Sequence, residues 1–285
     1  MKGSQSLLRP SATVERPRSQ FFKLPGHVQN NELITETFSA STILAIGALL
    51  QGLLVLFVPR YWILLPTLVV LFIRFADTLA ITLRFRANPY LEGSFDKKWA
   101  VVIPDQDGNF AETPGDEKVA VLQLAIKINH PMALFAPNVR NVKSFTTRML
   151  DELDAQAPDN GFLGLSEWHS VDERGANEIM LLSYRRSIDD VHRYFQSPTH
   201  LSAWKWWDQT AHKDSNALRH VGISHEVFEA PRNRWEAVGL NFQPSRLGAT
   251  TYLRKGDKLI GGTVEDAWIS PIVEAKGRMR LSKGD

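Results

Sequence analysis

The stretch VAVLQLAIKI, residues 119–128, decides the fold of the larger part of this chain. Its residues alternate between two faces, and Leu122, Leu124 and Ile126 lie on the more apolar one. An apolar pattern with a period of two predicts a half-buried β-strand. About 130 residues are enough for one compact domain. We therefore expect this strand to open a domain over residues 119–252.

The elements after this strand change type in a readable order. They are a helix capped by Asn141, strands at 162–170 and 178–186 around a turn at 172–175, helices that begin at Ser187 and Ser197, and strands at 220–228 and 235–242. Ser187 forms a capping box with Asp190, and Ser197 precedes a proline, which favours the first turn of a helix. This order predicts an α+β fold on the ferredoxin-like, split βαβ plan, with one extra helix.

Two apolar stretches precede this domain, at 38–58 and 61–83. The first runs 21 residues without a charge, which is enough for a helix to cross the ~30 Å hydrocarbon core. The second carries Arg74 and Asp77, which share a helix face and can pair there. The sequence predicts an N-terminal transmembrane helical hairpin. It leaves open one span followed by an interfacial helix, or a buried helical pair in a soluble protein.

Basic residues flank this hairpin at both ends, whereas its turn carries only Arg60. The positive-inside rule then places both ends on the cytosolic side, and we expect the membrane to be that of the endoplasmic reticulum. The chain has no cysteine, which fits a reducing compartment. Its net charge is only +2, so a nucleic-acid partner is not suggested.

The rest of the chain is rich in turn residues and charges. We expect a flexible cytosolic tail at 1–37, a linker at 84–118 with one short strand near 100–103, and a loosely attached C-terminal tail at 253–285. Proline, glycine and aspartate recur too often in these segments for long regular elements.

Histidine and aromatic side chains are the candidates for chemistry. His200, Trp204 and Trp207 fall on one helical face because they are spaced i, i+4 and i+7. His225 shares a strand face with apolar neighbours, where a neutral imidazole suits a general base. We expect a water-excluding cavity on the sheet face away from the helices, closed by a second copy. The predicted catalytic residues are His225 and His200, and the predicted substrate contacts are Trp204, Trp207, Tyr184, Trp168 and Asn241.

These residues also have structural explanations. Trp204 and Trp207 are what an amphipathic helix needs for packing on a sheet. His200 can be a solvated residue at a helix start, and His225 a hydrogen-bonded core histidine. The sequence has no HExxH, GxSxG or GxGxxG pattern, so a zinc or iron site, a serine nucleophile and a dinucleotide site are not supported.

Three short motifs carry a family resemblance: SPTHLSAW at 197–204, VGISHEV at 221–227 and LNFQP at 240–244, which is followed by Leu247-Gly248. With the order of elements, they resemble the antibiotic-biosynthesis-monooxygenase-like family of dimeric α+β barrel proteins, in its fungal membrane-anchored branch. The resemblance covers about residues 95–252. It implies a homodimer that oxygenates a lipophilic secondary metabolite, in some members without metal or flavin. Related barrels bind heme, and in heme-degrading relatives the proximal histidine sits about where this chain has Trp204.

We therefore expect a membrane-anchored, cytosol-facing monooxygenase that oxidises a hydrophobic secondary-metabolite intermediate, a terpenoid or polyketide, with no cofactor. One alternative is a heme-dependent dehydratase of the same fold, with His200 or His225 as the axial ligand. The other is a non-enzymatic module that binds or carries a lipophilic intermediate in the same cavity.

Overall fold

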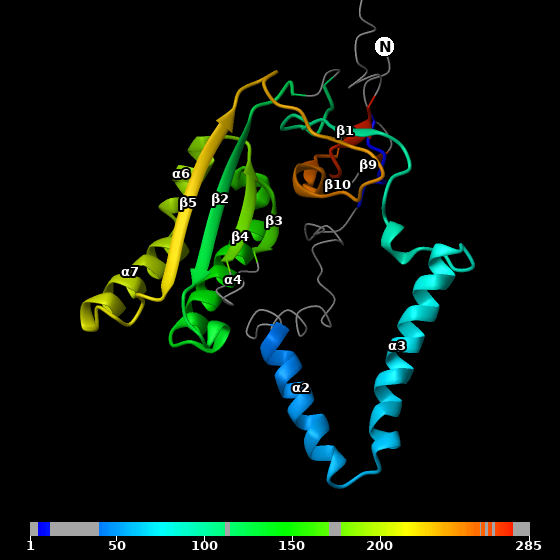
Figure 1. Ribbon diagram of the computed structural model, residues 1–285. Coiled ribbons are helices and arrows are strands. Elements are labelled where there is room, and N and C mark those ends of the chain that lie inside the picture. The colour runs from blue at the N-terminus through cyan, green and yellow to red at the C-terminus, as the bar shows by residue number, and fades with distance from the viewer. Residues whose placement is uncertain are drawn as a thin grey trace, which may run out of the picture.

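The computed structural model describes residues 5–11, 40–111, 115–170, 178–256, 258–259, 262–263 and 266–275. Most of the predicted N-terminal tail at 1–37, the predicted turn at 172–175 and the last residues, 276–285, lie outside the described part. The described chain contains two apolar helices, an α+β domain and a set of small sheets beside it (Figure 1).

The main sheet has four antiparallel strands in the order β3-β4-β2-β5. They are β2 (Val119–Ile128), β3 (Phe162–Ser170), β4 (Glu178–Arg185) and β5 (Val221–Ala230). Leu124 in β2 lies opposite Leu181 in β4 and His225 in β5. This order is that of the ferredoxin-like plan, so the α+β class and the predicted element order of this sheet are confirmed.

Three helices cover one face of this sheet (Figure 1): α4 (Val139–Ala155), α6 (Ile188–Phe195) and α7 (Pro198–Lys213). The Ser187 hydroxyl accepts a bond from the Asp190 amide at 3.3 Å, and Ser197 accepts one from the His200 amide at 3.3 Å. Both predicted helix starts are thereby confirmed. The start predicted at Asn141 is wrong: α4 begins earlier because its apolar face extends back to buried Val139.

Small sheets lie beside the other face. One consists of β1 (Trp99–Val101), β6 (Val238–Gly239) and β11 (Ile272–Glu274), and β7 (Tyr252–Arg254) pairs with β10 (Ala267–Ile269). The shorter elements are α5 (Ala157–Asn160), β8 (Lys258–Leu259), β9 (Gly262–Thr263), and the 3-10 helices η1 (Pro89–Leu91), η2 (Ala133–Phe135) and η3 (Arg246–Ala249).

The small sheets correct three expectations. The predicted linker and C-terminal tail pair with each other through β1 and β11, and Ile272 is fully buried. The expectation of a loosely attached tail is therefore wrong for residues 267–275. Of the strand expected at 235–242, only β6 is present, and it pairs with β1 rather than with the main sheet. Asn241 ends the extended backbone there, because its φ of 51° is left-handed.

Trp99 joins the small sheets to the main one. Its side chain is 4% exposed and belongs to a buried cluster with Tyr184 of β4 and Ile272 of β11. A Cβ atom at Gly239 or Gly248 would press on the Trp99 indole. These two glycines therefore let the indole pack directly on backbone, and the cluster covers the Tyr184 side of the main sheet.

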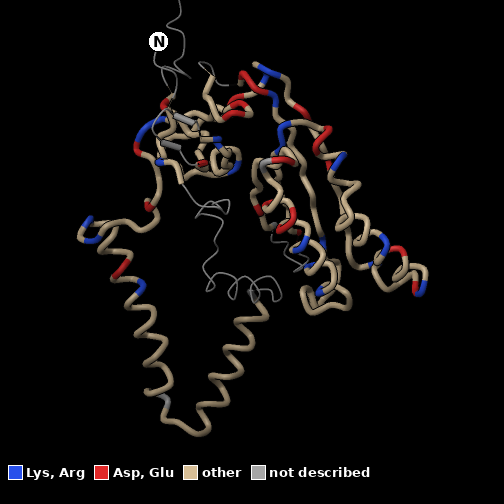
Figure 2. The backbone as a smooth tube through the Cα atoms, turned by 180° about the vertical axis from the view of Figure 1, so that it is seen from behind, with Lys and Arg blue, Asp and Glu red and all other residues tan. Residues whose placement is uncertain are grey.

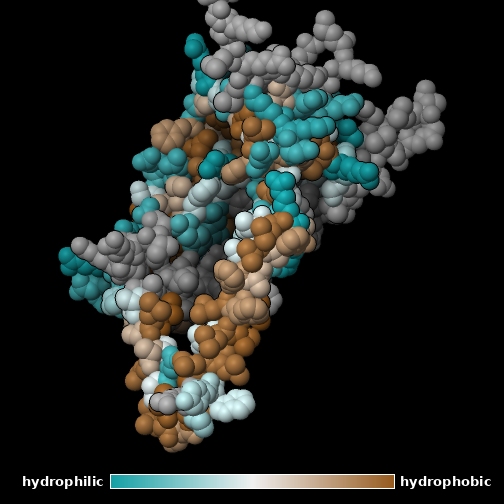
Figure 3. Space-filling model, turned by 45° about the vertical axis from the view of Figure 1, so that its right-hand side comes forward, coloured by the Kyte–Doolittle hydropathy of each residue, from teal (hydrophilic) through white to brown (hydrophobic). Residues whose placement is uncertain are grey.

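Two helices, α2 (Ala40–Val55) and α3 (Arg60–Thr82), stand away from the α+β domain as a V (Figure 1). Figure 2 shows few charges along them except near the end of α3, and Figure 3 shows hydrophobic side chains gathered there. Among the described residues, Tyr61–Thr82 is the helix long and apolar enough to cross a membrane, with a mean hydropathy of 1.9 and nothing buried against the protein.

Within the described residues, α2 covers the 16 residues Ala40–Val55 and ends in a turn before Pro59, and α3 covers 23 residues. Asp77 pairs with Arg86, beyond the end of α3, rather than with Arg74. Its charge therefore lies near the C-terminal end of α3, which leads into the rest of the protein.

Candidate active site

A cavity of about 420 Å³ lies between the three helices and the main sheet. The predicted apolar faces line it: Leu122, Leu124 and Ile126 from β2, and Phe145, Met149 and Leu153 from α4. Volume and lining are typical of a site for one small hydrophobic molecule. The sequence prediction put the cavity on the face away from the helices. A separate pocket of about 590 Å³ does lie there, lined by Val121, Tyr184 and Trp99, but His200, Trp204 and Trp207 line the cavity on the helix side.

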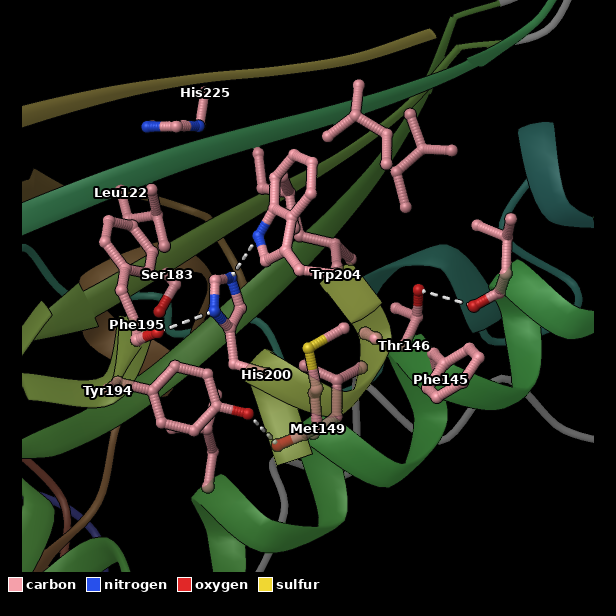
Figure 4. Close-up of a pocket in the computed structure, with 18 of the residues that line it drawn as sticks. Leu122, Phe145, Thr146, Met149, Ser183, Tyr194, Phe195, His200, Trp204 and His225 are labelled. Carbon is pink, nitrogen blue, oxygen red and sulfur yellow. Dashed lines mark hydrogen bonds between the residues drawn. The ribbon is translucent and has the colours of Figure 1, made fainter. Parts of the chain in front are cut away.

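His200 stands where α6 ends and α7 begins. Its amide is held by the Ser197 cap, and its ring Nδ1 lies 2.8 Å from the carbonyl oxygen of Phe195, the last residue of α6. A carbonyl oxygen only accepts, so Nδ1 carries the proton and donates it. Nε2 then keeps its lone pair and accepts a bond from the Trp204 indole N–H at 3.3 Å. Figure 4 shows these two bonds holding the ring between Phe195 and Trp204.

Burial in this setting lowers the pKa of His200 from its ordinary value of 6.5. Desolvation is the largest cause, the bond to Phe195 acts in the opposite direction, and the nearby His225 lowers the pKa further. The imidazole is therefore neutral at pH 7, with its basic nitrogen bonded to the Trp204 indole at the cavity wall. A neutral, oriented imidazole in an apolar pocket is equipped to accept a proton from a bound molecule.

Aromatic rings continue from His200 along the cavity. Phe195 stacks on His200 with 5.2 Å between centroids, and Trp204 meets His200 edge-on at 6.3 Å. Trp207 follows Trp204 at 6.3 Å. Both tryptophans and His200 line the cavity, so the helical face predicted from their spacing is the one that faces it.

His225 lies at the mouth of the cavity rather than inside it. The prediction placed its ring among apolar neighbours, but β5 is an edge strand, and the side chains of His225 and Ile223 are exposed. The His225 ring is 5.5 Å from Phe195, which stands between it and His200. Trp204 is also 46% exposed and Leu201 48%, so the cavity opens between α7 and β5.

The other three predicted site residues lie elsewhere. Tyr184 points to the opposite face, into the Trp99 cluster, where burial raises its pKa to about 12. Trp168 is 40% exposed, with the Arg246 guanidinium 4.8 Å from its ring. Asn241 is exposed in a loop beside the small sheets. The structure therefore brings together His200, Trp204, Trp207 and His225, and leaves these three outside the cavity.

Polar residues that the sequence reasoning missed also line the cavity. Ser183 and Arg185 are alternate residues of β4, and both are buried. Tyr194 donates its hydroxyl to the carbonyl oxygen of Met149 at 3.1 Å (Figure 4). The period-two pattern of β4 was the available signal, since Leu181, Ser183 and Arg185 share one face. Only the sheet register shows that this is the face toward the helices.

A heme iron at His200 would have to displace the Trp204 indole N–H, which occupies Nε2 at 3.3 Å. The other ring nitrogen, Nδ1, already donates to the Phe195 carbonyl oxygen, as it does in many metal-bound histidines. His225 stands at the exposed mouth of the cavity. Within the described ranges, no three His, Cys, Asp or Glu side chains gather where they would hold a metal ion.

The α+β domain thus holds a mostly apolar cavity with a histidine at its wall, an arrangement suited to a small hydrophobic molecule and to proton transfer. Residues 119–247 match the family described as Monooxygenase af470-like. Monooxygenase af470 from Aspergillus fumigatus is 28% identical over 238 residues, which cover 84% of this chain and 83% of that relative. Over these residues, the chain is similar to the monooxygenase af470-like family.

Two solved structures share parts of the fold. The aldoxime dehydratase OxdRE, in complex with butyraldoxime, is 17% identical and covers 50% of this chain and 33% of its own, with a TM-score of 0.33. SnoaB, a cofactor-independent oxygenase from Streptomyces nogalater, is 15% identical and covers 39% of this chain and 91% of its own, with a TM-score of 0.25. At such values the activities of these two proteins are not carried over to this chain.

Proposed function

We propose that this relative of monooxygenase af470 is a membrane-anchored enzyme that oxidises a hydrophobic secondary-metabolite intermediate, such as a terpenoid or polyketide, without a cofactor. The observation that carries the proposal is the state of His200. Its Nδ1 donates to the Phe195 carbonyl oxygen, burial lowers its pKa, and the Nε2 lone pair accepts a long bond from Trp204 at the wall of an apolar cavity. Such a base can remove a proton from carbon that a carbonyl group acidifies, either directly or through conjugation.

Proton removal makes the substrate the electron donor. His200 takes a proton from an acidic C–H, and the resulting carbanion or enolate passes one electron to O₂. The two radicals combine at that carbon to form a C–O bond, and His200 returns its proton to the distal oxygen of the peroxide. Loss of water, with the second hydrogen of that carbon, leaves C=O. One oxygen atom enters the product and the other becomes water, while both electrons come from the substrate.

The walls of the cavity supply the remaining requirements. Trp204 and Trp207 offer flat apolar surfaces to a ring-containing substrate, and Leu122 with Met149 keeps water away from the carbanion. The Trp204 N–H is 3.3 Å from Nε2, which is long for a hydrogen bond. A substrate C–H can therefore displace it at small cost.

The pH profile of turnover should report the lowered pKa of His200. Protonated His200 cannot accept a proton, so kcat/KM should be flat above pH 6.5 and fall only when the pH drops through a value below 6.5. Trp204→Phe removes a donor that stabilises the neutral ring, so it should move this acid limb to higher pH. An acid limb that stays in place in the variant would show that Trp204 does not act on the base.

Two other functions are separated from this one by direct measurements. A heme-dependent dehydratase of the same fold would show a Soret band in the purified protein, which our proposal does not require. A carrier that shields or delivers a lipophilic intermediate would use the same cavity but return its ligand unchanged under oxygen. The neutral base at the cavity wall favours the enzyme, because a carrier has no use for it.

We also propose that α2 and α3 anchor the protein in the endoplasmic reticulum membrane, with the catalytic domain in the cytosol. Exposed apolar side chains along both helices, such as Leu44 at 73% and Phe72 at 70%, support this. A lipophilic substrate partitions into the bilayer, so an anchored cavity meets it at a higher local concentration.

Membrane insertion predicts two results. The full chain should stay in the pellet after alkaline carbonate extraction, whereas a chain lacking residues 40–82 should appear in the supernatant. Glycosylation acceptor sites fused to either terminus should stay unmodified in microsomes, because both ends are expected in the cytosol. Modification of the C-terminal site would contradict this orientation.

A second copy of the chain could pack on the open part of the main sheet. Phe228 is 53% exposed on the sheet face away from the helices, where it lies opposite Val121 near the C-terminal end of the edge strand β5. We propose that a second copy covers this face through an interface of standard size, about 800 Å² per partner. Light scattering of the full chain in detergent micelles, corrected for detergent, should give two chains, and Phe228→Asp should give one. A wild-type protein that is monomeric at micromolar concentration would contradict the proposed homodimer.

A further inference from the structure

Arg185 is a fully buried cation without a hydrogen-bond partner. Its relative exposure is 0%, and Nε, Nη1 and Nη2 all lack a partner within the described ranges. A guanidinium carries five N–H donors, and buried donors are nearly always paired. Arg185 is therefore an exception for which packing alone gives no reason.

Its surroundings are aromatic. The Arg185 Cζ atom lies 5.0 Å from the centroid of the Tyr194 ring and 5.5 Å from that of Phe162. Burial lowers the pKa of Arg185 to about 10, and Tyr194 and Asp190 act against this shift. The side chain is still a cation at neutral pH. Ring faces offset part of the cost of its desolvation but accept none of its N–H bonds.

The carboxylates near Arg185 do not pair with it. Asp190 accepts from the Ser187 hydroxyl at 2.7 Å and pairs with the exposed Arg193 at 2.9 Å. Glu152 acts on Tyr194 but is not among the charges that act on Arg185, and its own Oε2 is buried without a partner in the described part of the chain. A buried cation of this kind calls for an anion from outside the chain.

Ser183 provides a second unpaired donor beside it. Its hydroxyl is buried without a partner in the described part of the chain, and its side chain is 6% exposed. Ser183 and Arg185 are two residues apart on β4, so both point to the helix-covered face. Both line the cavity. The Tyr194 ring, which Arg185 contacts, also lies near His200, with 6.1 Å between the centroids of the Tyr194 and His200 rings.

We propose that Arg185 and Ser183 bind an anionic oxygen group, a carboxylate or an enolate, at the buried end of an otherwise hydrophobic ligand. The apolar body then lies along Phe195 and Trp204 toward the mouth at His225. The inference names the substrate class of the proposed oxygenase, and its link to turnover rests on that proposal. If the ligand is an enolate, Arg185 also holds the charge that His200 generates.

Calorimetric titration of the full chain in lipid nanodiscs tests this with two matched probe pairs, and empty nanodiscs correct for partitioning. The carboxylate pair is 2-naphthoate against 2-naphthalenemethanol. The enolate pair is 2-hydroxy-1,4-naphthoquinone, ionised at neutral pH, against its 2-methoxy ether. At least one anion should bind roughly tenfold or more tightly than its neutral partner, since charge-assisted bonds in a buried site are strong. The pair that shows the preference identifies the anion.

Two substitutions test whether Arg185 causes the preference for the anion. Arg185→Met should remove it by weakening the anion roughly tenfold or more while changing the neutral probe by less than about threefold. Arg193→Met, which removes the same charge from an exposed side chain, should keep the preference. Equal affinities for anion and neutral partner in the wild-type protein would overturn the proposal, whether or not Arg185→Met folds. A preference that persists in folded Arg185→Met would overturn it as well.

Binding and turnover fail separately in this design. If the cavity prefers the anion but the protein never consumes oxygen, the anion site stands and the proposed oxygenase function is wrong. If the protein oxygenates a neutral substrate and the cavity shows no preference for anions, the oxygenase function stands and the anion site is wrong.

Discussion

His200→Ala lowers kcat by about 100-fold or more, the range expected for loss of a general base, and leaves the protein folded. The reason is that His200 alone among the predicted site residues combines a fixed tautomer, a lowered pKa and a lone pair at the cavity wall. Steady-state kinetics with any substrate that the wild-type enzyme turns over gives the number, and circular dichroism confirms the fold.

His225→Ala is the matched control. His225 is exposed at the mouth of the same cavity, so its removal should change kcat/KM by less than about tenfold and act mainly through KM. If His225→Ala instead removes turnover and His200→Ala does not, the base is His225, and the order proposed for the two residues is reversed.

Trp99→Ala lowers the free energy of unfolding by about 3–5 kcal/mol, the usual cost of truncating a fully buried tryptophan. The indole is 4% exposed, rests on Gly239 and Gly248, and joins β1 and β11 to the Tyr184 side of the main sheet. Urea denaturation of the full chain, followed by circular dichroism, measures the change from the midpoint and the slope.

Trp168→Ala is the comparison for that experiment. Trp168 is 40% exposed and makes one cation–π contact with Arg246, so its loss should cost less than about 1 kcal/mol. Equal effects of the two substitutions would mean that residues 84–118 are the linker that the sequence suggested, and that the small sheets contribute little to stability.

Local signals in the sequence predicted local structure well. The period-two pattern gives β2 with the bounds Val119–Ile128, and the caps at Ser187 and Ser197 place α6 and α7. Because His200, Trp204 and Trp207 lie on one helix, their common face follows from spacing alone, and the cavity contains all three.

What the sequence could not supply depends on contacts between distant residues. Pairing of β1 with β11 joins residues more than 170 positions apart, and no local pattern in either three-residue strand announces it. Which face of β4 meets the helices is likewise set by the strand register. In the observed register Arg185 faces the cavity, whereas the prediction from sequence placed Tyr184 there. His225 looked enclosed because its alternation is that of an inner strand, whereas β5 lies at the sheet edge.

The most direct test of the proposed oxygenase uses ¹⁸O₂ and anthrone, an apolar tricyclic ketone with an acidic C–H that suits a cavity of about 420 Å³. Purified wild-type protein, with no added metal, flavin or heme, should convert anthrone to anthraquinone faster than buffer and place one ¹⁸O atom in the product. His200→Ala should fall to the buffer rate. Equal enhancement of the rate by both proteins, or a new oxygen atom that comes from water, would contradict the account.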